Sequence, residues 1–216
     1  MPIELFSHPF SSYCQKALIA LYENGTSFEY QHMEHDGVGA ELGRISPSGK
    51  FPVLREGERV VAEVSIIIEY LDVHHPGATR FIPEDRDAAL QVRFMDRFFD
   101  HYVATSYQKL VSNALRPEAD RDPYGVDEAK GMLDRAYRWL DGHLEGREWA
   151  AGDFSLADCA AGPHLFYADW AHEIPAAFRN VRAYRQRLIA RPSFARAIEE
   201  ARQYRHYFPL GAPDRD

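Results

Sequence analysis

A short loop near the start of the chain constrains the fold more than any other feature of the sequence. The apolar run Ile3–Ser7 predicts a strand, and three residues later the small and polar segment Ser11-Ser12-Tyr13-Cys14 opens a helical pattern. A helix N-terminus gathers unpaired backbone N–H groups and the positive end of the helix dipole. A hydroxyl or thiol at this point is therefore well placed to stabilise a thiolate.

Composition excludes several classes of protein. The 216 residues suit one large domain or two small ones, and 45% hydrophobic with 27% charged residues is typical of a soluble globular chain. No apolar run approaches the roughly 18 residues of a membrane span, and residues 1–10 lack the layout of a signal peptide. Two cysteines are too few for a disulfide scaffold, so we expect a cytoplasmic protein. A formal net charge of −8 argues against nucleic acid as a partner.

Residues 1–76 alternate strand and helix patterns and predict a first domain. Its order is strand, helix, strand, helix, strand, strand, helix, which is the thioredoxin-like topology. The strands are expected at Ile3–Ser7, Phe28–His32, Val53–Leu54 and Val60–Ala62, and the helices at Ser12–Asn24, around Ala40–Arg44 and from Val64 or Ser65.

Strand signals end after a connector rich in proline and glycine, which we place at residues 77–87. Residues 88–216 predict an all-helical domain. One long helix is expected over residues 86–115 and a second over 125–144, and further helices begin near Ser155, Val181 and Ser193. Gly162-Pro163 lies inside the third of these helices, where either the helix kinks or burial overrides local propensity.

The chain resembles the glutathione transferases of the serine type over nearly its whole length. The loop at residues 11–14 is similar to the Cys-x-x-Cys motif of thioredoxins, but Ser11 replaces the first cysteine, so two-thiol exchange is not available. The resemblance rests on four features in the right order: Ser11, Phe51-Pro52, Glu63 and the capping pair Ser155-x-x-Asp158. It implies glutathione as co-substrate, Ser11 as the hydrogen-bond donor to its sulfur, and no metal.

The same resemblance implies where glutathione binds. Pro52 would follow a cis peptide bond, and the main chain of Phe51 would hold the cysteinyl part of the ligand. Glu63 would bind the γ-glutamyl group together with the N–H groups that begin the next helix. Val64 stands where the family has serine, so we expect binding to weaken by about 1 kcal/mol unless the Ser65 hydroxyl takes its place. Read without the resemblance, Glu63 and Ser65 are simply helix caps.

Two basic residues flank the turn before Phe51. The resemblance brings Arg44 and Lys50 to the glycyl carboxylate of glutathione, whereas on residue type alone both are solvated surface charges. The pocket for the second substrate would lie against the first long helix of the second domain. Its candidate residues are aromatic or polar, but an aromatic stripe at helical spacing is equally expected of a core: Phe98, His101, Tyr102, Tyr107 and Lys109.

The sequence thus favours an enzyme that activates the thiolate of glutathione through Ser11 for attack on a small hydrophobic electrophile. A non-catalytic protein-interaction module is the first alternative, because Val64 departs from the pattern. A glutathione-dependent isomerase or thiol reductase is the second, although Cys14 sits at the wrong end of the motif for a reductase and suits a buried, small apolar position. By analogy with the family we expect a homodimer joined along the first two helices of the all-helical domain, residues 88–216, with no membrane or nucleic-acid partner.

Overall fold

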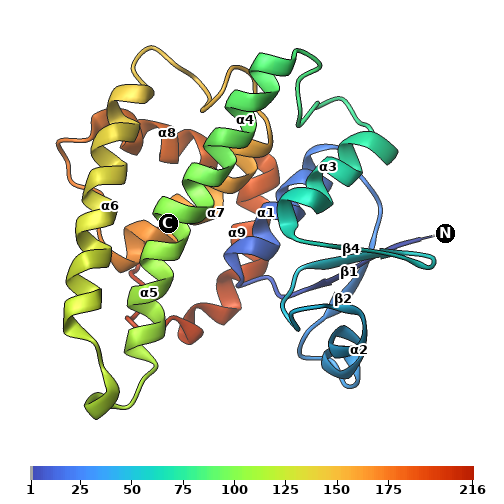
Figure 1. Cartoon of the computed structure of the whole chain (residues 1–216), viewed down its shortest axis with the longest axis horizontal. Helices are drawn as coiled ribbons and strands as arrows, with labels where there is room; N and C mark the ends of the chain where they lie inside the picture. The colour runs from blue at the N-terminus through green and yellow to red at the C-terminus, as the bar shows by residue number, and fades with distance from the viewer. Residues whose placement is uncertain (1) are drawn as a thin grey trace.

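A computed structural model describes residues 2–216. A four-stranded sheet and its helices stand beside a larger, all-helical part (Figure 1). The elements run in the order β1 (Ile3–Ser7), α1 (Ser12–Glu23), β2 (Glu29–His32), α2 (Val38–Ile45), β3 (Val53–Glu56), β4 (Arg59–Ala62), α3 (Val64–His74), α4 (Arg86–Phe98), a π-helical segment (Phe99–Ala104), α5 (Thr105–Ala114), a 3-10 turn (Glu118–Asp120), α6 (Pro123–His143), α7 (Leu156–Ala171), α8 (Arg179–Ala190), α9 (Pro192–Ala201) and a final 3-10 helix (Arg202–Tyr207).

The sheet has the strand order β2-β1-β3-β4, with β1 parallel to β2 and the other pairs antiparallel. Alternate residues of the strands face opposite sides. Leu5 and Leu54 belong to the main core with α1 and α3, whereas Phe6 and Val53 form a small separate cluster with Leu42 of α2. Helices therefore cover both faces of the sheet, as Figure 1 shows, and the thioredoxin-like fold predicted from the sequence is confirmed.

The main core continues from the sheet into the helical part without a break. Its centre is α7, in which nearly every residue is buried and which packs against α1 and α4. Pro163 lies inside this helix, and the helix continues through it from Leu156 to Ala171. Burial therefore overrides the local cost of the proline. Gly162 allows α9 to approach closely, because a Cβ there would lie 3.3 Å from the ring of Phe194.

The helix predicted over residues 86–115 differs from the structure in one respect. It is helical throughout, but Phe99–Ala104 form a π-helical segment between α4 and α5. Within this segment the carbonyl of Asp100 accepts a hydrogen bond from Thr105 Oγ at 3.1 Å, and the Asp100 carboxylate is held by Lys16 and His164. Hydropathy at helical spacing does not reveal such an insertion, which depends on contacts with other elements. Segments of this kind occur frequently at functional sites.

No helix within residues 2–216 combines the length and the apolar character needed to cross a membrane.

Candidate functional site

A cavity of about 330 Å³ opens between the sheet domain and the start of the helical part. Its walls come from the first turns of α1 and α3, the turn before β3, and the region where α4 meets α5. The lining residues are Tyr13, Ser48, Lys50, Phe51, Pro52, Ala62, Glu63, Val64, Ser65, Arg97, Asp100, His101, Thr105 and Gln108. Six of the residues predicted to bind glutathione therefore share one cavity: Lys50, Phe51, Pro52, Glu63, Val64 and Ser65.

The backbone has two unusual features at this cavity. The Phe51–Pro52 peptide is cis, as the resemblance predicted. Glu63 has φ 68°, the one positive φ among the non-glycine residues that the structure describes. This conformation is costly for a residue with a Cβ, and such strain clusters at ligand-binding and active sites. Glu63 is exposed and occupies the N-cap position of α3, and its side chain makes no hydrogen bond to the helix, so the carboxylate is available to a ligand.

Ser65 does not supply the hydroxyl that Val64 lacks. Its Oγ donates to Asp96 Oδ2 at 2.9 Å and accepts from Lys16 Nζ at 3.0 Å, and Arg97 also contacts it. These contacts occupy the Ser65 hydroxyl at the floor of the cavity. Val64 is itself buried at the start of α3, where its side chain offers no polar contact.

A buried set of charges supports the floor of the cavity. Lys16 Nζ lies 2.5 Å from Asp96 Oδ1 and 2.9 Å from Asp100 Oδ1, with no exposed surface on the lysine side chain. Arg97 and His164 each contact Asp100 as well, at 2.9 and 3.0 Å. Burial alone would raise the pKa of Asp100, but the hydrogen bond from His164 and the charge of Lys16 outweigh it and hold the pKa well below its usual range. Asp100 is therefore an anion at the cavity wall.

Ser11 occupies the N-cap position of α1, and its Oγ accepts a long hydrogen bond of 3.4 Å from the N–H of Cys14. It is partly exposed, but it does not appear in the cavity lining given above. Tyr13, two residues further on, does line the cavity. Burial, and next the charge of Asp100, raise the pKa of Tyr13 to about 12, so its hydroxyl keeps its proton at neutral pH and can donate it in a hydrogen bond.

Cys14 is fully buried, and its Sγ accepts from the N–H of His8 at 3.4 Å. Burial raises the pKa of this thiol. A protonated, inaccessible thiol is not an exchange group, so the loop has no redox-active cysteine.

The remaining predicted site residues lie in different surroundings. His101 lines the cavity. Phe98 is buried among Phe99, Tyr102 and Trp139, and Tyr102 extends outward from the same aromatic group. The hydroxyl of Tyr107 donates to Ser12 Oγ at 2.5 Å in the core. Lys109 pairs with Glu128 on α6 at 3.4 Å, and Arg44 is largely exposed and pairs with Glu41 on its own helix.

Comparison with known proteins identifies the family. Residues 5–79 match the family model for the glutathione S-transferase N-terminal domain, and residues 123–187 match the model for the glutathione S-transferase C-terminal domain. A glutathione S-transferase-like protein of Fusarium sp is 30% identical over 170 residues, which cover 76% of each chain. The chain belongs to the glutathione S-transferase family.

Relatives in this family carry different kinds of name. A glutathione S-transferase of Methylobacillus flagellatus, solved with glutathione bound, superposes with a TM-score of 0.81 at 25% identity and covers 90% of this chain and 98% of its own. FtsZ-localized protein A of Caulobacter vibrioides is 27% identical over 207 residues, or 90% of each chain. The second name describes a location and not a reaction.

Tyr13 and several residues on one side of the α4–α5 region were not predicted as site residues from the sequence of this family member. Arg97, His101, Thr105 and Gln108 line the cavity at intervals of three or four residues. Only His101 was predicted from the sequence. The aromatic residues predicted beside it, Phe98, Tyr102 and Tyr107, do not line the cavity. The helical spacing from His101 was the signal that could have found the others. No such spacing in the sequence indicates that Tyr13 lines the cavity.

Proposed function

We propose that this protein binds glutathione in the cavity beside Glu63 and uses it to attack a small hydrophobic electrophile. The observation that supports this most strongly is that one cavity combines Lys50, the cis Phe51–Pro52 peptide and the strained Glu63 at the start of α3. A relative of 25% identity, the Methylobacillus flagellatus enzyme, was solved with glutathione bound.

The charges of the cavity suit a zwitterionic peptide. The γ-glutamyl end of glutathione carries an ammonium and a carboxylate, for which Glu63 and the N–H groups of the α3 N-terminus are complementary partners. Lys50 is the partner that we assign to the glycyl carboxylate at the other end. Arg44 is not part of this assignment, because its guanidinium already pairs with Glu41.

Ser11 is our candidate for activating the thiol. Its hydroxyl lies at the N-terminus of α1, where the unpaired N–H groups and the helix dipole favour a thiolate over a thiol. The nucleophile belongs to glutathione, so Ser11 has to donate a hydrogen bond and need not act as a base. Tyr13 is the second candidate donor, because it lines the cavity and remains protonated. The electrophile would meet the sulfur on the side of the cavity formed by Tyr13, His101 and Gln108.

A non-catalytic role remains the alternative function. Val64 lacks the hydroxyl found in the family, Ser65 is tied to Lys16 and Asp96, and a relative of 27% identity is named for its association with FtsZ. Calorimetric titration with glutathione tests the ligand that the catalytic role requires. We expect binding to the wild type and a loss of roughly tenfold in Glu63→Gln, which removes the charge that meets the ammonium. Glu69→Gln on the same helix is the matched control, because Glu69 pairs with Arg93 outside the cavity.

The result that rejects glutathione as ligand is the absence of binding to the wild type at millimolar concentration. Equal binding by the wild type and Glu63→Gln would reject the assignment of Glu63. A glutathione-dependent isomerase would pass the same binding test and differ only in its substrate. A thiol reductase is not favoured, because Cys14 is buried and protonated.

We further propose that two copies associate through an apolar surface that includes α4, in the helical domain where the dimer contacts are expected, and that extends beyond that expectation onto β4 and α3 of the sheet domain. We assign to this dimer surface the exposed hydrophobic side chains of the three elements: Val60, Ile66, Val73, Leu90 and Phe94. Val60 and Ile66 also line one shallow hollow there with Val73. Clustered apolar side chains on a folded surface mark association sites. Both cysteines are buried and unpaired, which suits the reducing cytoplasm where we place the protein.

A further inference from the structure

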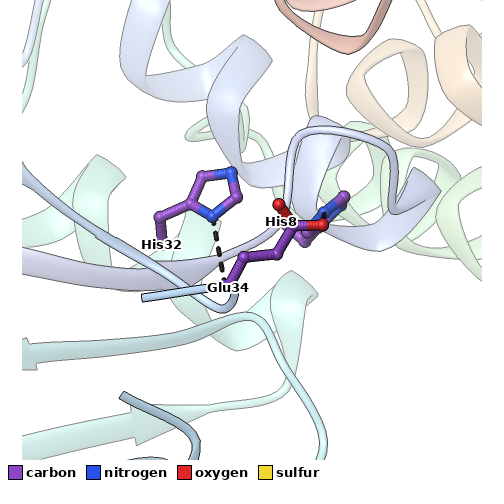
Figure 2. A group of neighbouring side chains, drawn as sticks. All are labelled: His8, His32 and Glu34. Atoms are coloured by element: carbon purple, nitrogen blue, oxygen red, sulfur yellow. Dashed lines mark hydrogen bonds and ion pairs between the residues drawn. The ribbon is translucent and has the colours of Figure 1, made fainter. Parts of the chain in front are cut away.

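A cluster of two histidines and a glutamate lies where β1 and β2 end, next to the C-terminal 3-10 helix. His8 follows β1, His32 ends β2 and Glu34 follows it by two residues. Each offers one donor atom, and these atoms all lie within 4.8 Å of one another. Figure 2 shows the Glu34 carboxylate extending toward the ring of His8, and the Nε2–Oε1 distance between them is 3.2 Å.

The cluster is held from the C-terminal side by two tyrosines. The hydroxyl of Tyr204 lies 3.1 Å from His32 Nε2, and the hydroxyl of Tyr207 donates to Glu34 Oε1 at 2.9 Å. His8 is mostly buried, with a side-chain exposure of 12%, while Glu34 is 43% exposed. His32 and Tyr204 also line a large open cavity of about 610 Å³ between β2 and α9, so an ion can approach from solvent.

We propose that His8, His32 and Glu34 bind one divalent transition-metal ion, for which Zn²⁺ is the test ion. Two imidazole nitrogens and one carboxylate oxygen form a donor set that suits zinc and leaves the fourth position to water. Zinc–ligand bonds of about 2.0–2.2 Å in a tetrahedron place neighbouring donors roughly 3.3 Å apart. The His8–Glu34 pair already has this separation, and because all three donor atoms lie within 4.8 Å of one another, small side-chain movements would complete the arrangement.

Metal binding would change the hydrogen bonds that the imidazole nitrogens of His8 and His32 make. His8 Nδ1 accepts from the N–H of Phe10 at 3.1 Å, and His32 Nδ1 accepts from the N–H of Glu34 at 3.2 Å. A neutral imidazole that accepts at Nδ1 carries its proton on Nε2. If the ion binds through Nε2, each proton moves to Nδ1 and both backbone N–H groups lose their acceptors; if it binds through Nδ1, it displaces those N–H groups directly. The carbonyl of His8 also accepts from the N–H of Ser11 at 3.0 Å, so the loop that leads to Ser11 must adjust when the ion binds.

The first test is a calorimetric titration of chelator-treated, full-length protein with zinc chloride. We expect one ion per chain with an affinity in the micromolar range or tighter, and a loss of tenfold or more in both His32→Gln and Glu34→Gln. His206→Gln is the matched control, because His206 is an exposed histidine of the adjacent 3-10 helix that is not part of the cluster. Failure of the wild type to bind at about 100 µM zinc, or an equal loss in His206→Gln, overturns the proposal.

The second test needs no variant and so does not depend on whether a variant folds. Long-range ¹H–¹⁵N spectra of the histidine rings report which nitrogen carries the proton. Without zinc we expect His8 and His32 to be protonated on Nε2, and with one equivalent of zinc bound through Nε2 to be protonated on Nδ1. Ring ¹⁵N signals of His8 and His32 that do not shift when zinc binds overturn the proposal. Neither test uses glutathione, so their outcome is separate from that of the proposed function.

Discussion

Lys16 on α1 and Asp100 in the π-helical segment form a buried ion pair across 84 positions of sequence, with Nζ 2.9 Å from Oδ1. The pair joins the first helix of the sheet domain to the helical part directly beneath the cavity. Lys16 also holds Asp96 and Ser65, so one buried ammonium organises three side chains from α4, α3 and the π-helical segment.

Replacing Lys16 with methionine should therefore destabilise the protein strongly. The substitution leaves two carboxylates buried without their ammonium partner, a change that costs about 3–5 kcal/mol in comparable cases. Urea denaturation measures the loss in free energy of unfolding. Lys109→Met is the control, because its partner Glu128 is exposed and the pair is worth less than about 1 kcal/mol. A Lys16→Met protein within 1 kcal/mol of the wild type would show that the buried pair does not support the fold.

Replacing Val64 with serine should strengthen the binding of glutathione. Val64→Ser places a hydroxyl at the first residue of α3, beside Glu63, where the γ-glutamyl group is proposed to bind. One neutral hydrogen bond contributes about 1 kcal/mol, so we expect glutathione to bind roughly fivefold more tightly. Ser65→Ala is the companion variant, and since the Ser65 hydroxyl is tied to Lys16 and Asp96 it should lower stability without a comparable gain in affinity. Unchanged affinity in Val64→Ser would argue against a γ-glutamyl group at this position.

Stability should fall in mild acid partly because of His164. Burial lowers the pKa of this fully buried ring, although the nearby Asp100 opposes the shift. The unfolded chain then binds the proton more readily than the folded protein, so the free energy of unfolding falls as the pH drops below about 6.5. His164→Gln keeps a donor for Asp100 and removes the titration. Its urea midpoint should change less between pH of about 7.5 and 5.5 than that of the wild type, and an equal change would exclude His164 as the source.

Charged substitutions within the proposed dimer surface test whether it mediates association. Ile66→Glu and Phe94→Glu place carboxylates within an apolar contact on α3 and α4, where burying them unpaired would cost several kcal/mol. We expect light scattering on a sizing column to give a dimer for the wild type and a monomer for both variants. Leu115→Glu is the control, since Leu115 is 70% exposed at the end of α5, away from this surface. A monomeric wild type, or dimeric variants, would contradict the proposal.

The sequence predicted those parts of the molecule that depend on local chemistry. The box of Ser155 and Asp158, the four strands and the cis peptide before Pro52 all follow from short motifs or from the family pattern they compose. The capping box shows why, because the N–H and hydroxyl of Ser155 both bond to Asp158 Oδ2 within three residues of sequence. Such contacts are present in any helix that begins with these residues.

The features that sequence reasoning missed depend on partners far along the chain. Lys16 looks like an ordinary polar residue of a helix, and only Asp96 and Asp100 explain its complete burial. Tyr13 faces the cavity because α1 packs against α7, where His164 meets its ring at 4.9 Å. The cluster of His8, His32 and Glu34 is created by the parallel pairing of β1 and β2, which brings Ser7 beside His32. None of these contacts has a signature in residue type or spacing.

The most direct test of the account is the thiol pKa of bound glutathione, read from thiolate absorbance in the ultraviolet as a function of pH. In the wild type we predict a pKa below about 7.5, compared with about 8.5 for an ordinary thiol. Ser11→Ala should raise it by at least about one unit while glutathione still binds, because a donor to the thiolate is lost but the contacts to Glu63 and Lys50 remain. Tyr13→Phe should leave it unchanged. A depressed pKa that survives Ser11→Ala and is lost in Tyr13→Phe would transfer the role to Tyr13, and an ordinary pKa in the wild-type complex would contradict thiolate activation by this protein.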